Sequence, residues 1–372
     1  MLTNKLPYSV EQPWLPFSEA LLNWDEAFHH LMLNDKLRMH AYEKAIKETV
    51  KPGDVVVDLG TGTGILSLWA LEAGASCVYG IDLNSDILEL AIKMMMQHKF
   101  SDRFIAISKL SYDVILPERA DVLISEIIGN IADNEDFQPI LNDAIRRFLK
   151  PGGKCLPRDT CAYIAPITAK KAHAAIKMRE VKTLNPNYQL DKLMQEKNIR
   201  NPFNLYYDTL IEKTAQLAPP QRLQYYHDDW SQQPVYCKVR SFIVERDAEF
   251  TGFQCYFIAD LSDTVSLDIS GDDQSLHSCS DSWKHAYLPI EQPIAVRKGD
   301  VISLSFSRYY PDDINALKFR QIYRWKGHVE RDGRHYITFD QCMDERVFSD
   351  LGHDKYKVKR EKGRLSEERF HF

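Results

Sequence analysis

Short apolar runs alternate with segments of helical periodicity between residues 55 and 125, and this alternation constrains the fold more than any other feature. The apolar runs predict strands at 55–58, 77–82, 104–108 and 122–125. The intervening segments 65–73 and 85–98 predict helices. Strands that are apolar along their whole length and alternate with helices form a parallel sheet with both faces covered. We therefore expect a Rossmann-like α/β sheet in the first half of the chain.

The pattern changes after the turn at 151–153, where the strands become short and alternate between apolar and polar residues. Such strands are predicted at 252–261, 294–307, 322–329 and 335–340. Arg331-Asp332-Gly333 lies between the last two and predicts a hairpin turn. The stretch from about 168 to 230 is polar and helical in character. These features predict a β-barrel-like domain with a helical insertion.

A chain of 372 residues is long enough for about two domains, at roughly 100–200 residues each. Residues 29–49 predict one helix, because apolar side chains recur there at helical spacing. We expect the chain to divide into an N-terminal helical arm, a Rossmann-like domain, a β-barrel-like domain with an insertion at about 168–230, and a charged tail, at 1–50, 51–150, 151–350 and 351–372.

Composition excludes several classes of protein. The net charge is −6, so a global basic field for nucleic acid or an anionic membrane is absent. The longest apolar stretches are too short to span a bilayer, and residues 1–14 lack the apolar run of a signal peptide. Seven cysteines include no CxxC pair, which argues against a zinc knuckle or a disulfide scaffold. We expect a cytoplasmic protein with no metal site and no nucleic-acid or membrane partner.

A glycine-rich loop, DLGTGTG at 58–64, joins the first predicted strand to the first helix after it. Glycines allow a tight turn and let a ligand approach the backbone closely, although a plain strand-to-helix turn uses them too. Asp82 ends the next predicted strand, where a carboxylate can accept hydrogen bonds from both ribose hydroxyls of an adenosine. The form GxGxG opening with Asp58 is that of S-adenosyl-L-methionine sites, whereas a dinucleotide site has GxGxxG and binds phosphate, which Asp58 would repel.

Four segments resemble the protein arginine methyltransferases, over roughly residues 29–310. They are the helix HHLMLNDKLRMHAY (29–42), the loop 58–64 with ILS after it, SEIIG (125–129) with Glu135, and the segment 283–300 beginning Trp-Lys. Each match alone is weak, but all four occur in the order and spacing of the family. The resemblance implies a class I methyltransferase sheet followed by a β-barrel-like domain.

The resemblance also implies an activity, the transfer of a methyl group from S-adenosyl-L-methionine to a guanidino nitrogen of arginine in protein. Glu126 and Glu135 correspond to the family's two glutamates. A guanidinium is a poor nucleophile with a pKa above about 12. Two carboxylates can grip its N–H groups, localise its charge and point the free nitrogen at the methyl group. The simpler interpretation makes both glutamates solvated loop acids.

Other residues acquire roles through the same resemblance. The implied cofactor-binding residues are His29, Arg38, Asp58, Gly60, Gly62, Gly64, Asp82 and, for adenine, Asp113 or Tyr112. Arg38 would bind the carboxylate of the cofactor, and the implied substrate pocket contains Met32, Asp35 and Trp283. The simpler alternatives are an exposed Arg38–Asp35 ion pair, a core methionine and a surface histidine.

The chain departs from the family in the acceptor pocket. Ser282 replaces the histidine that usually partners the helix aspartate, so the partner of Asp35 is either lost or supplied by another histidine such as His285. Ile127, Ile128 and Asn130 replace aromatic residues. The cofactor lid within 1–50 has no clear match, and Trp24 and Phe28 are loose candidates. Two alternatives therefore remain, a small guanidine such as free arginine as the acceptor, and an inactive methyltransferase-like binding protein.

The resemblance further implies a homodimer, because the family places its dimerisation arm where this chain has the segment 168–230. We expect exposed aromatic side chains of that segment to dock on the partner, namely Tyr206, Tyr207, Tyr225 and Tyr226. The alternative is a monomer whose insertion covers its own barrel.

Overall fold

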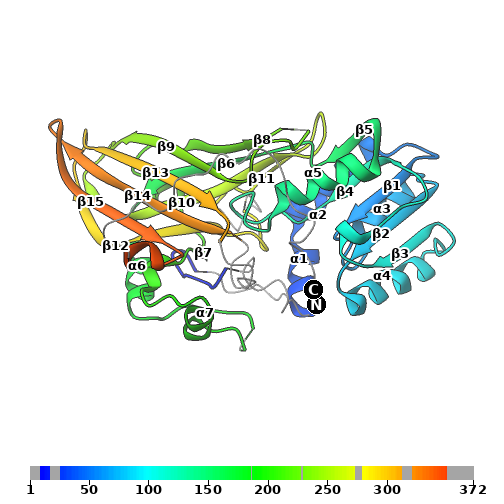
Figure 1. Cartoon of the computed structure of the whole chain (residues 1–372), viewed down its shortest axis with the longest axis horizontal. Helices are drawn as coiled ribbons and strands as arrows, with labels where there is room; N and C mark the ends of the chain where they lie inside the picture. Colours follow the sequence, from blue (N-terminus) through cyan, green and yellow to red (C-terminus); the bar gives the residue numbers. More distant parts are fainter. Residues whose placement is uncertain are drawn as a thin grey trace.

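The computed structural model describes residues 9–16, 26–185, 187–227, 229–272, 279–311 and 321–349. The molecule is elongated, with a parallel sheet at one end and antiparallel sheets at the other (Figure 1). The predicted charged tail lies outside the described residues, as do much of the arm and the side chains of the two lid candidates, Trp24 and Phe28.

The parallel sheet confirms the Rossmann-like prediction. Its strands are β1 (Val55–Leu59), β2 (Cys77–Asp82), β3 (Phe104–Ser108), β4 (Ala120–Ser125) and β5 (Leu149–Leu156), in the order β3-β2-β1-β4-β5. Every residue of β1 is buried, because helices cover both faces of the sheet. The sheet includes β5 and so extends to Leu156, six residues past the expected boundary at 150.

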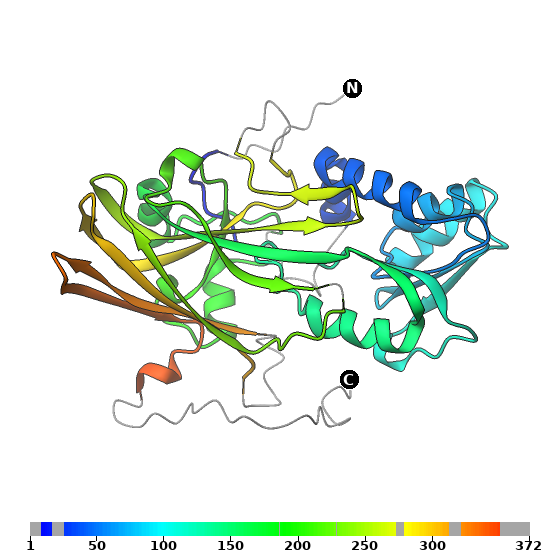
Figure 2. The ribbon, with the colours of Figure 1, turned by 90° about the horizontal axis from the view of Figure 1, so that it is seen from above.

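Helices connect these strands and lead into the first of them. They are α3 (Ile65–Glu72), α4 (Ser85–Gln97), α5 (Phe137–Phe148) and the 3₁₀ turn η2 (Ser111–Asp113). The single helix predicted at 29–49 is instead two, α1 (Glu26–Asn34) and α2 (Lys36–Thr49), because Asp35 caps the second by accepting a hydrogen bond from the backbone N–H of Arg38. Both helices lie between the two ends of the molecule (Figures 1 and 2).

The second half forms two antiparallel sheets. One contains β6 (Asp159–Ile167), β7 (Tyr207–Thr209), β8 (Gln221–Tyr226), β10 (Ala248–Asp260), β11 (Ser266–Asp268) and β12 (His285–Val296). The other contains β9 (Tyr236–Ile243), β13 (Val301–Tyr309), β14 (Ile322–Arg331) and β15 (Arg334–Cys342), before a short helix α8 (Arg346–Ser349). Phe250 and Phe253 of the first sheet pack on Phe339 of the second, 5.7 and 5.8 Å apart between ring centroids. The strand pairing thus confirms an antiparallel second half built of two packed sheets, and its closure into a β-barrel stays a prediction.

The hairpin predicted around Arg331-Asp332-Gly333 joins β14 to β15. Asp332 and Gly333 have φ values of 52° and 72°, the positive pair that a two-residue type I′ turn requires. Aspartate and glycine tolerate this conformation, so the local sequence was sufficient to place the turn.

The segment 168–230 is only partly helical. It contains α6 (Lys170–Lys177), α7 (Leu190–Glu196) and the 3₁₀ turns η3 (Pro202–Asn204) and η4 (Lys213–Ala215), but β7 and β8 pair with β12 and β6. The prediction of exposed aromatic side chains was wrong, because Tyr206, Tyr207 and Tyr226 are fully buried and Tyr225 is half-buried. The three buried rings belong to the chain's own core, two of them on the strands β7 and β8. No helix among the described residues is both long and apolar enough to cross a membrane.

Candidate active site

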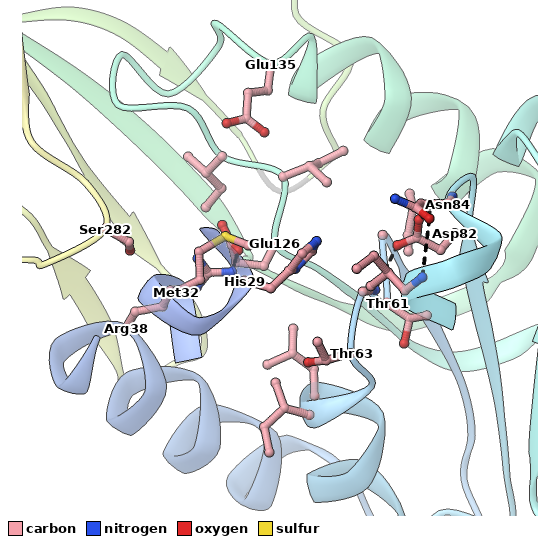
Figure 3. Close-up of a pocket in the computed structure, with 18 of the residues that line it drawn as sticks. His29, Met32, Arg38, Thr61, Thr63, Asp82, Asn84, Glu126, Glu135 and Ser282 are labelled. Carbon is pink, nitrogen blue, oxygen red and sulfur yellow. Dashed lines mark hydrogen bonds and ion pairs between the residues drawn. The ribbon is translucent and has the colours of Figure 1, made fainter. Parts of the chain in front are cut away.

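A cavity of about 530 Å³ opens at the carboxyl ends of β1, β2 and β4. This is the edge of an open parallel sheet at which ligands bind. The cavity brings together nine of the residues singled out in the sequence: His29, Met32, Arg38, Gly60, Gly62, Asp82, Glu126, Glu135 and Trp283. Figure 3 shows Asp82 and Asn84 on one side, Arg38 and Ser282 on the other, and Glu135 reaching in from the loop that follows β4.

The glycine loop needs its glycines for two separate reasons. Gly60, Gly62 and Gly64 all have positive φ, at 75°, 52° and 85°, a region that favours glycine. A Cβ on Gly64 would lie 2.8 Å from the Cβ of Ala91, so this glycine allows α3 to pack on α4. A Cβ on Gly62 would lie 3.8 Å from the ring of His29. Gly60 and Gly62 line the cavity, whereas Gly64 does not.

Asp58 lies behind the glycine loop, outside the cavity lining, and is fully buried. One of its oxygens accepts hydrogen bonds from the hydroxyls of Thr61 and Ser67, at 2.7 and 2.6 Å. The other oxygen has no hydrogen-bond partner among the described residues. Burial raises the pKa of Asp58 to about 6. This acid therefore holds the shape of the loop.

Asp82 sits at the end of β2 and faces the cavity. Its carboxylate accepts hydrogen bonds from the backbone N–H groups of Gly62 and Asn84, at 2.8 and 2.9 Å. These contacts fix the orientation of the carboxylate and leave each oxygen with a further lone pair. Asp82 can therefore accept hydrogen bonds from a ligand without rearrangement.

Arg38 forms an ion pair with Glu126 inside the cavity. The two side chains are 10% and 6% exposed, so the alternative of an exposed helical ion pair between Arg38 and Asp35 is wrong. The guanidinium also lies over the ring of Trp283, 4.9 Å from its centroid. Burial lowers the pKa of Arg38 to about 10, while nearby acids oppose this effect. The cation stays protonated near neutral pH.

Asp35 is buried and its partners are serines. Its carboxylate accepts hydrogen bonds from the hydroxyls of Ser280 and Ser282 and from the backbone N–H of Ser282. The suggestion that His285 replaces the missing histidine was wrong. The Nδ1 atom of His285 accepts a hydrogen bond from the backbone N–H of Ile211 at 3.1 Å, and burial lowers the pKa of this histidine to about 4.

Glu135 lines the cavity from a loop with an unusual backbone. Ala132 and Asp136, on either side of it, have φ values of 67° and 61°. Each left-handed non-glycine residue costs roughly 1–3 kcal/mol and persists only where its surroundings hold it. The position of Glu135 therefore depends on contacts made by the rest of the loop.

The structure does not place Asp113 in the cavity. Asp113 is exposed on η2, while the preceding residues Lys109, Leu110 and Ser111 line the cavity instead. The 3₁₀ turn directs Ser111 inward and Asp113 outward. Tyr112, the second candidate for contact with adenine, is half-buried and does not line the cavity.

Sequence reasoning named Asn130 but missed the polar group that it forms with two further cavity residues, Asp208 and Lys284. Asn130 donates hydrogen bonds through Nδ2 to the carboxylate of Asp208 and to the backbone carbonyl of Lys284, at 2.6 and 3.1 Å. Burial lowers the pKa of Lys284 to about 7. Lys284 directly follows Trp283 in the sequence, and this adjacency was the available signal. Asp208 lies on β7, which we expected to belong to a helical insertion.

Three potential metal ligands lie together away from the cavity, on the β14–β15 hairpin. His328 Nε2 and Glu330 Oε1 are 2.8 Å apart, and the rings of His328 and His335 stack 3.9 Å apart at an angle of 19°. Nearly parallel rings hold their nitrogen lone pairs in nearly parallel planes, whereas one tetrahedral metal ion needs lone pairs that converge on it. In this structure His328 and Glu330 share a hydrogen bond instead.

Comparison with protein families gives two matches, one in each half of the chain. The model of the ribosomal protein L11 methyltransferase family matches residues 38–156. The model of the PRMT5 oligomerisation domain family matches residues 159–314.

Two solved structures share the fold over most of the chain. The Trypanosoma brucei PRMT1 enzyme–prozyme heterotetrameric complex with AdoHcy covers 86% of this chain and 98% of its own, with a TM-score of 0.70 and 19% identity. Arabidopsis thaliana protein arginine methyltransferase 10 covers 85% and 97%, with a TM-score of 0.69 and 20% identity.

Curated relatives match in sequence. A probable protein arginine N-methyltransferase 6.1 of Oryza sativa subsp. indica is 36% identical over 142 residues, which is 38% of this chain and 37% of the relative. Protein arginine N-methyltransferase 6 of Danio rerio is 36% identical over 145 residues, or 38% and 41%. The matched region thus spans less than half the length of these relatives. The chain is therefore similar in sequence to protein arginine N-methyltransferases over this region, and it shares their two-part fold over most of its length.

Proposed function

We propose that this protein transfers a methyl group from S-adenosyl-L-methionine to a guanidino nitrogen of arginine in protein. One observation carries the proposal, the presence of Glu126 and Glu135 in the same cavity as the glycine loop and Asp82. Two acids that face an acceptor beside a methyl-donor site are what guanidinium methylation needs. The relatives named as arginine methyltransferases support the same assignment.

The residues present fit the cofactor. Gly60 and Gly62 leave open backbone at the cavity wall, and Asp82 offers fixed acceptors for ribose hydroxyls. Arg38 has five N–H donors, so it can bind the carboxylate of the cofactor while it also contacts Glu126. When bound, S-adenosyl-L-methionine supplies a methyl group already activated on a sulfonium.

The chain's own residues then act on the acceptor. Glu126 and Glu135 hold the guanidinium N–H groups by charge-assisted hydrogen bonds. Their negative charge draws the positive charge of the guanidinium away from the attacking nitrogen. Trp283 packs against Arg38, and so helps to fix the partner of Glu126.

A small guanidine is the second candidate acceptor, and one observation favours it. Asp208 and Lys284 lie in the cavity with Asn130 between them. An acid and an amine in one pocket can bind the ammonium and carboxylate groups of a free amino acid. The third candidate, an inactive binding protein, fits less well, because Arg38, Asp82 and both glutamates are all retained.

A methyl-transfer assay tests the proposal. Radiolabelled S-adenosyl-L-methionine is incubated with the protein and an Arg-Gly-rich peptide, free arginine or no acceptor. We expect label on the peptide, and we expect Glu135→Gln to lower turnover by about 10²-fold with little change in the cofactor dissociation constant. Glu118→Gln, on an exposed acid outside the cavity, is the matched control. Label on free arginine alone would favour the small acceptor, and full activity of Glu135→Gln would reject the role of the glutamate.

We also propose that the protein forms a homodimer. The match of residues 159–314 to an oligomerisation domain supports self-association, although the buried tyrosines of 168–230 rule out the docking contact that we expected from them. Light scattering tests this. A mass near 43.1 kDa, that of one chain, at micromolar concentration would reject the dimer.

A further inference from the structure

The loop that carries Glu135 contains three acids in four residues, Asp133-Asn134-Glu135-Asp136. Of the three, only Glu135 lines the cavity. Asp133 and Asp136 instead contact side chains of the antiparallel sheets, which come from the other half of the chain. The loop is thus shared between the two halves of the molecule.

The carboxylate of Asp133 accepts hydrogen bonds from three tyrosines, each on a different strand. Its Oδ2 atom accepts hydrogen bonds from Tyr226 of β8 and Tyr236 of β9, at 3.0 and 2.7 Å. Its Oδ1 atom accepts one from Tyr323 of β14, at 2.5 Å. Burial, and next the charge of Asp133, raise the pKa of all three tyrosines well above the usual value. The phenols therefore remain donors throughout the working pH range.

Arg308 of β13 joins both ends of the loop and is itself 1% exposed. Its Nη2 atom donates to the backbone carbonyl of Asp133 at 3.2 Å and to the carboxylate of Asp136 at 3.0 Å. Its Nη1 atom donates to the carbonyl of Pro234 at 2.7 Å, which anchors the guanidinium to the segment before β9. One planar group thus contacts the residues two before and one after Glu135.

The backbone of the loop needs such an anchor. Ala132 and Asp136 hold left-handed φ values of 67° and 61°, which non-glycine residues adopt only where their surroundings impose them. Arg308 contacts one of these residues directly and the neighbour of the other. Without it, two buried or partly buried acids beside Glu135 would also lose their balancing charge.

We propose that Arg308 is a positioning residue for Glu135. By pairing with Asp133 and Asp136, it fixes the loop and leaves Glu135 as the acid that the loop presents to the cavity. The inference rests on the proposed function, because Glu135 is the group that would hold the guanidinium.

The test compares matched variants by their kcat, divided by the measured concentration of cofactor-binding sites. Arg308→Lys keeps the charge but loses the planar fork, and Tyr236→Phe removes one donor to Asp133. Arg331→Lys is the control, because Arg331 pairs with Asp300 at 2.8 Å in the same sheet and lies outside the cavity. We expect kcat per binding site to fall about 10-fold or more in Arg308→Lys and about threefold in Tyr236→Phe, with the cofactor dissociation constant within about twofold. The control should keep its kcat.

A second readout does not depend on activity. Hydrogen exchange of the amides in 131–136 should speed up by about 10-fold or more in Arg308→Lys and stay unchanged in Arg331→Lys. Ala132→Gly added to Arg308→Lys should restore part of both readouts, because glycine adopts the left-handed conformation freely.

Three outcomes would overturn the inference. The first is a loss of cofactor-binding sites with unchanged kcat per site, which indicates a general folding role. The second is equal exchange at 131–136 in the wild type and Arg308→Lys. The third applies if Arg308→Lys does not fold, and it is a Tyr236→Phe variant with the same kcat and the same exchange at 131–136 as the wild type. A wild type that methylates no guanidine would reject the proposed function, while the exchange data would still decide the role of Arg308.

Discussion

Asp58→Asn should change how stability depends on pH in a way that the buried carboxyl group dictates. Burial raises the pKa of Asp58 from 3.8 to about 6. The folded state therefore holds this proton over a pH range in which the unfolded state has lost it. The contribution of this proton to the free energy of unfolding is fully present below about pH 4 and is lost as the pH rises through about 6. The variant has no such proton.

The magnitude follows from the two pKa values. The full rise from 3.8 to about 6 corresponds to roughly 3 kcal/mol, at about 1.36 kcal/mol per pH unit. About half of this loss is complete at pH 5, so the remaining change between about pH 5 and pH 8 is roughly 1.4 kcal/mol. Asparagine suits the site because the hydroxyls of Thr61 and Ser67 both donate to the same oxygen of Asp58. The amide oxygen of asparagine can take the place of that oxygen.

Urea unfolding of the wild type and the variant at several pH values measures this effect. The variant should gain about 1.4 kcal/mol relative to the wild type between about pH 5 and pH 8. The test uses the difference in unfolding free energy between the variant and the wild type, because His285 is present in both. Burial lowers the pKa of His285 to about 4, so its contribution to stability rises with pH below 6.5, opposite to that of Asp58. A difference constant to within about 0.5 kcal/mol, or one that falls with pH, would refute the reasoning.

Three further variants test separate parts of the site. Asp82→Ala should weaken S-adenosyl-L-methionine binding by about 1–3 kcal/mol in calorimetry, because a fixed acceptor is lost; unchanged affinity would remove Asp82 from the cofactor site. Ser282→Ala should lower the free energy of unfolding by about 1–2 kcal/mol, since buried Asp35 loses a donor, and unaltered urea midpoints would contradict this. Gly64→Ala should lower it by about 1–3 kcal/mol, because its Cβ would lie 2.8 Å from that of Ala91 at a φ of 85°, and a stabilised variant would contradict the contact.

The sequence predicted four strands of the parallel sheet because each is set by a local apolar run, but it missed β5, inside which it predicted the turn at 151–153. The predicted strands 77–82 and 104–108 have the same bounds as β2 and β3. Buried parallel strands are apolar along their length, so their boundaries coincide with the ends of apolar runs. The hairpin turn at Asp332-Gly333 was equally local, since two positive φ values suit those two residue types.

The tyrosines of the segment 168–230 were wrongly predicted to be exposed because each carries a polar hydroxyl. We treated Tyr226 as exposed, yet it is buried and its hydroxyl donates to Asp133. A tyrosine is buried without penalty only where its hydroxyl finds a partner, and this partner lies in the other half of the chain. Nothing near Tyr226 in the sequence indicates that contact.

In the candidate site, too, the sequence identified functional residues but not the residues that they contact. The sequence singled out Arg38 and Asp35 but gave neither its partner, Glu126 for the first and two serines for the second. Motif spacing identifies side chains that a ligand needs. It does not identify the protein groups that pair with those side chains before a ligand arrives.

The two halves of the chain are coupled at the cavity. Glu48 of α2 accepts hydrogen bonds from Ser262 and Thr264, which lie in the second half. Asp35 is held by serines of the second half, and the loop of Glu135 by Arg308. The first half thus supplies most of the cavity's functional groups, and the second half orients several of them. Substitutions in the second half can therefore alter the cavity without touching it, because hydrogen bonds that cross between the halves hold Asp35 and the loop of Glu135.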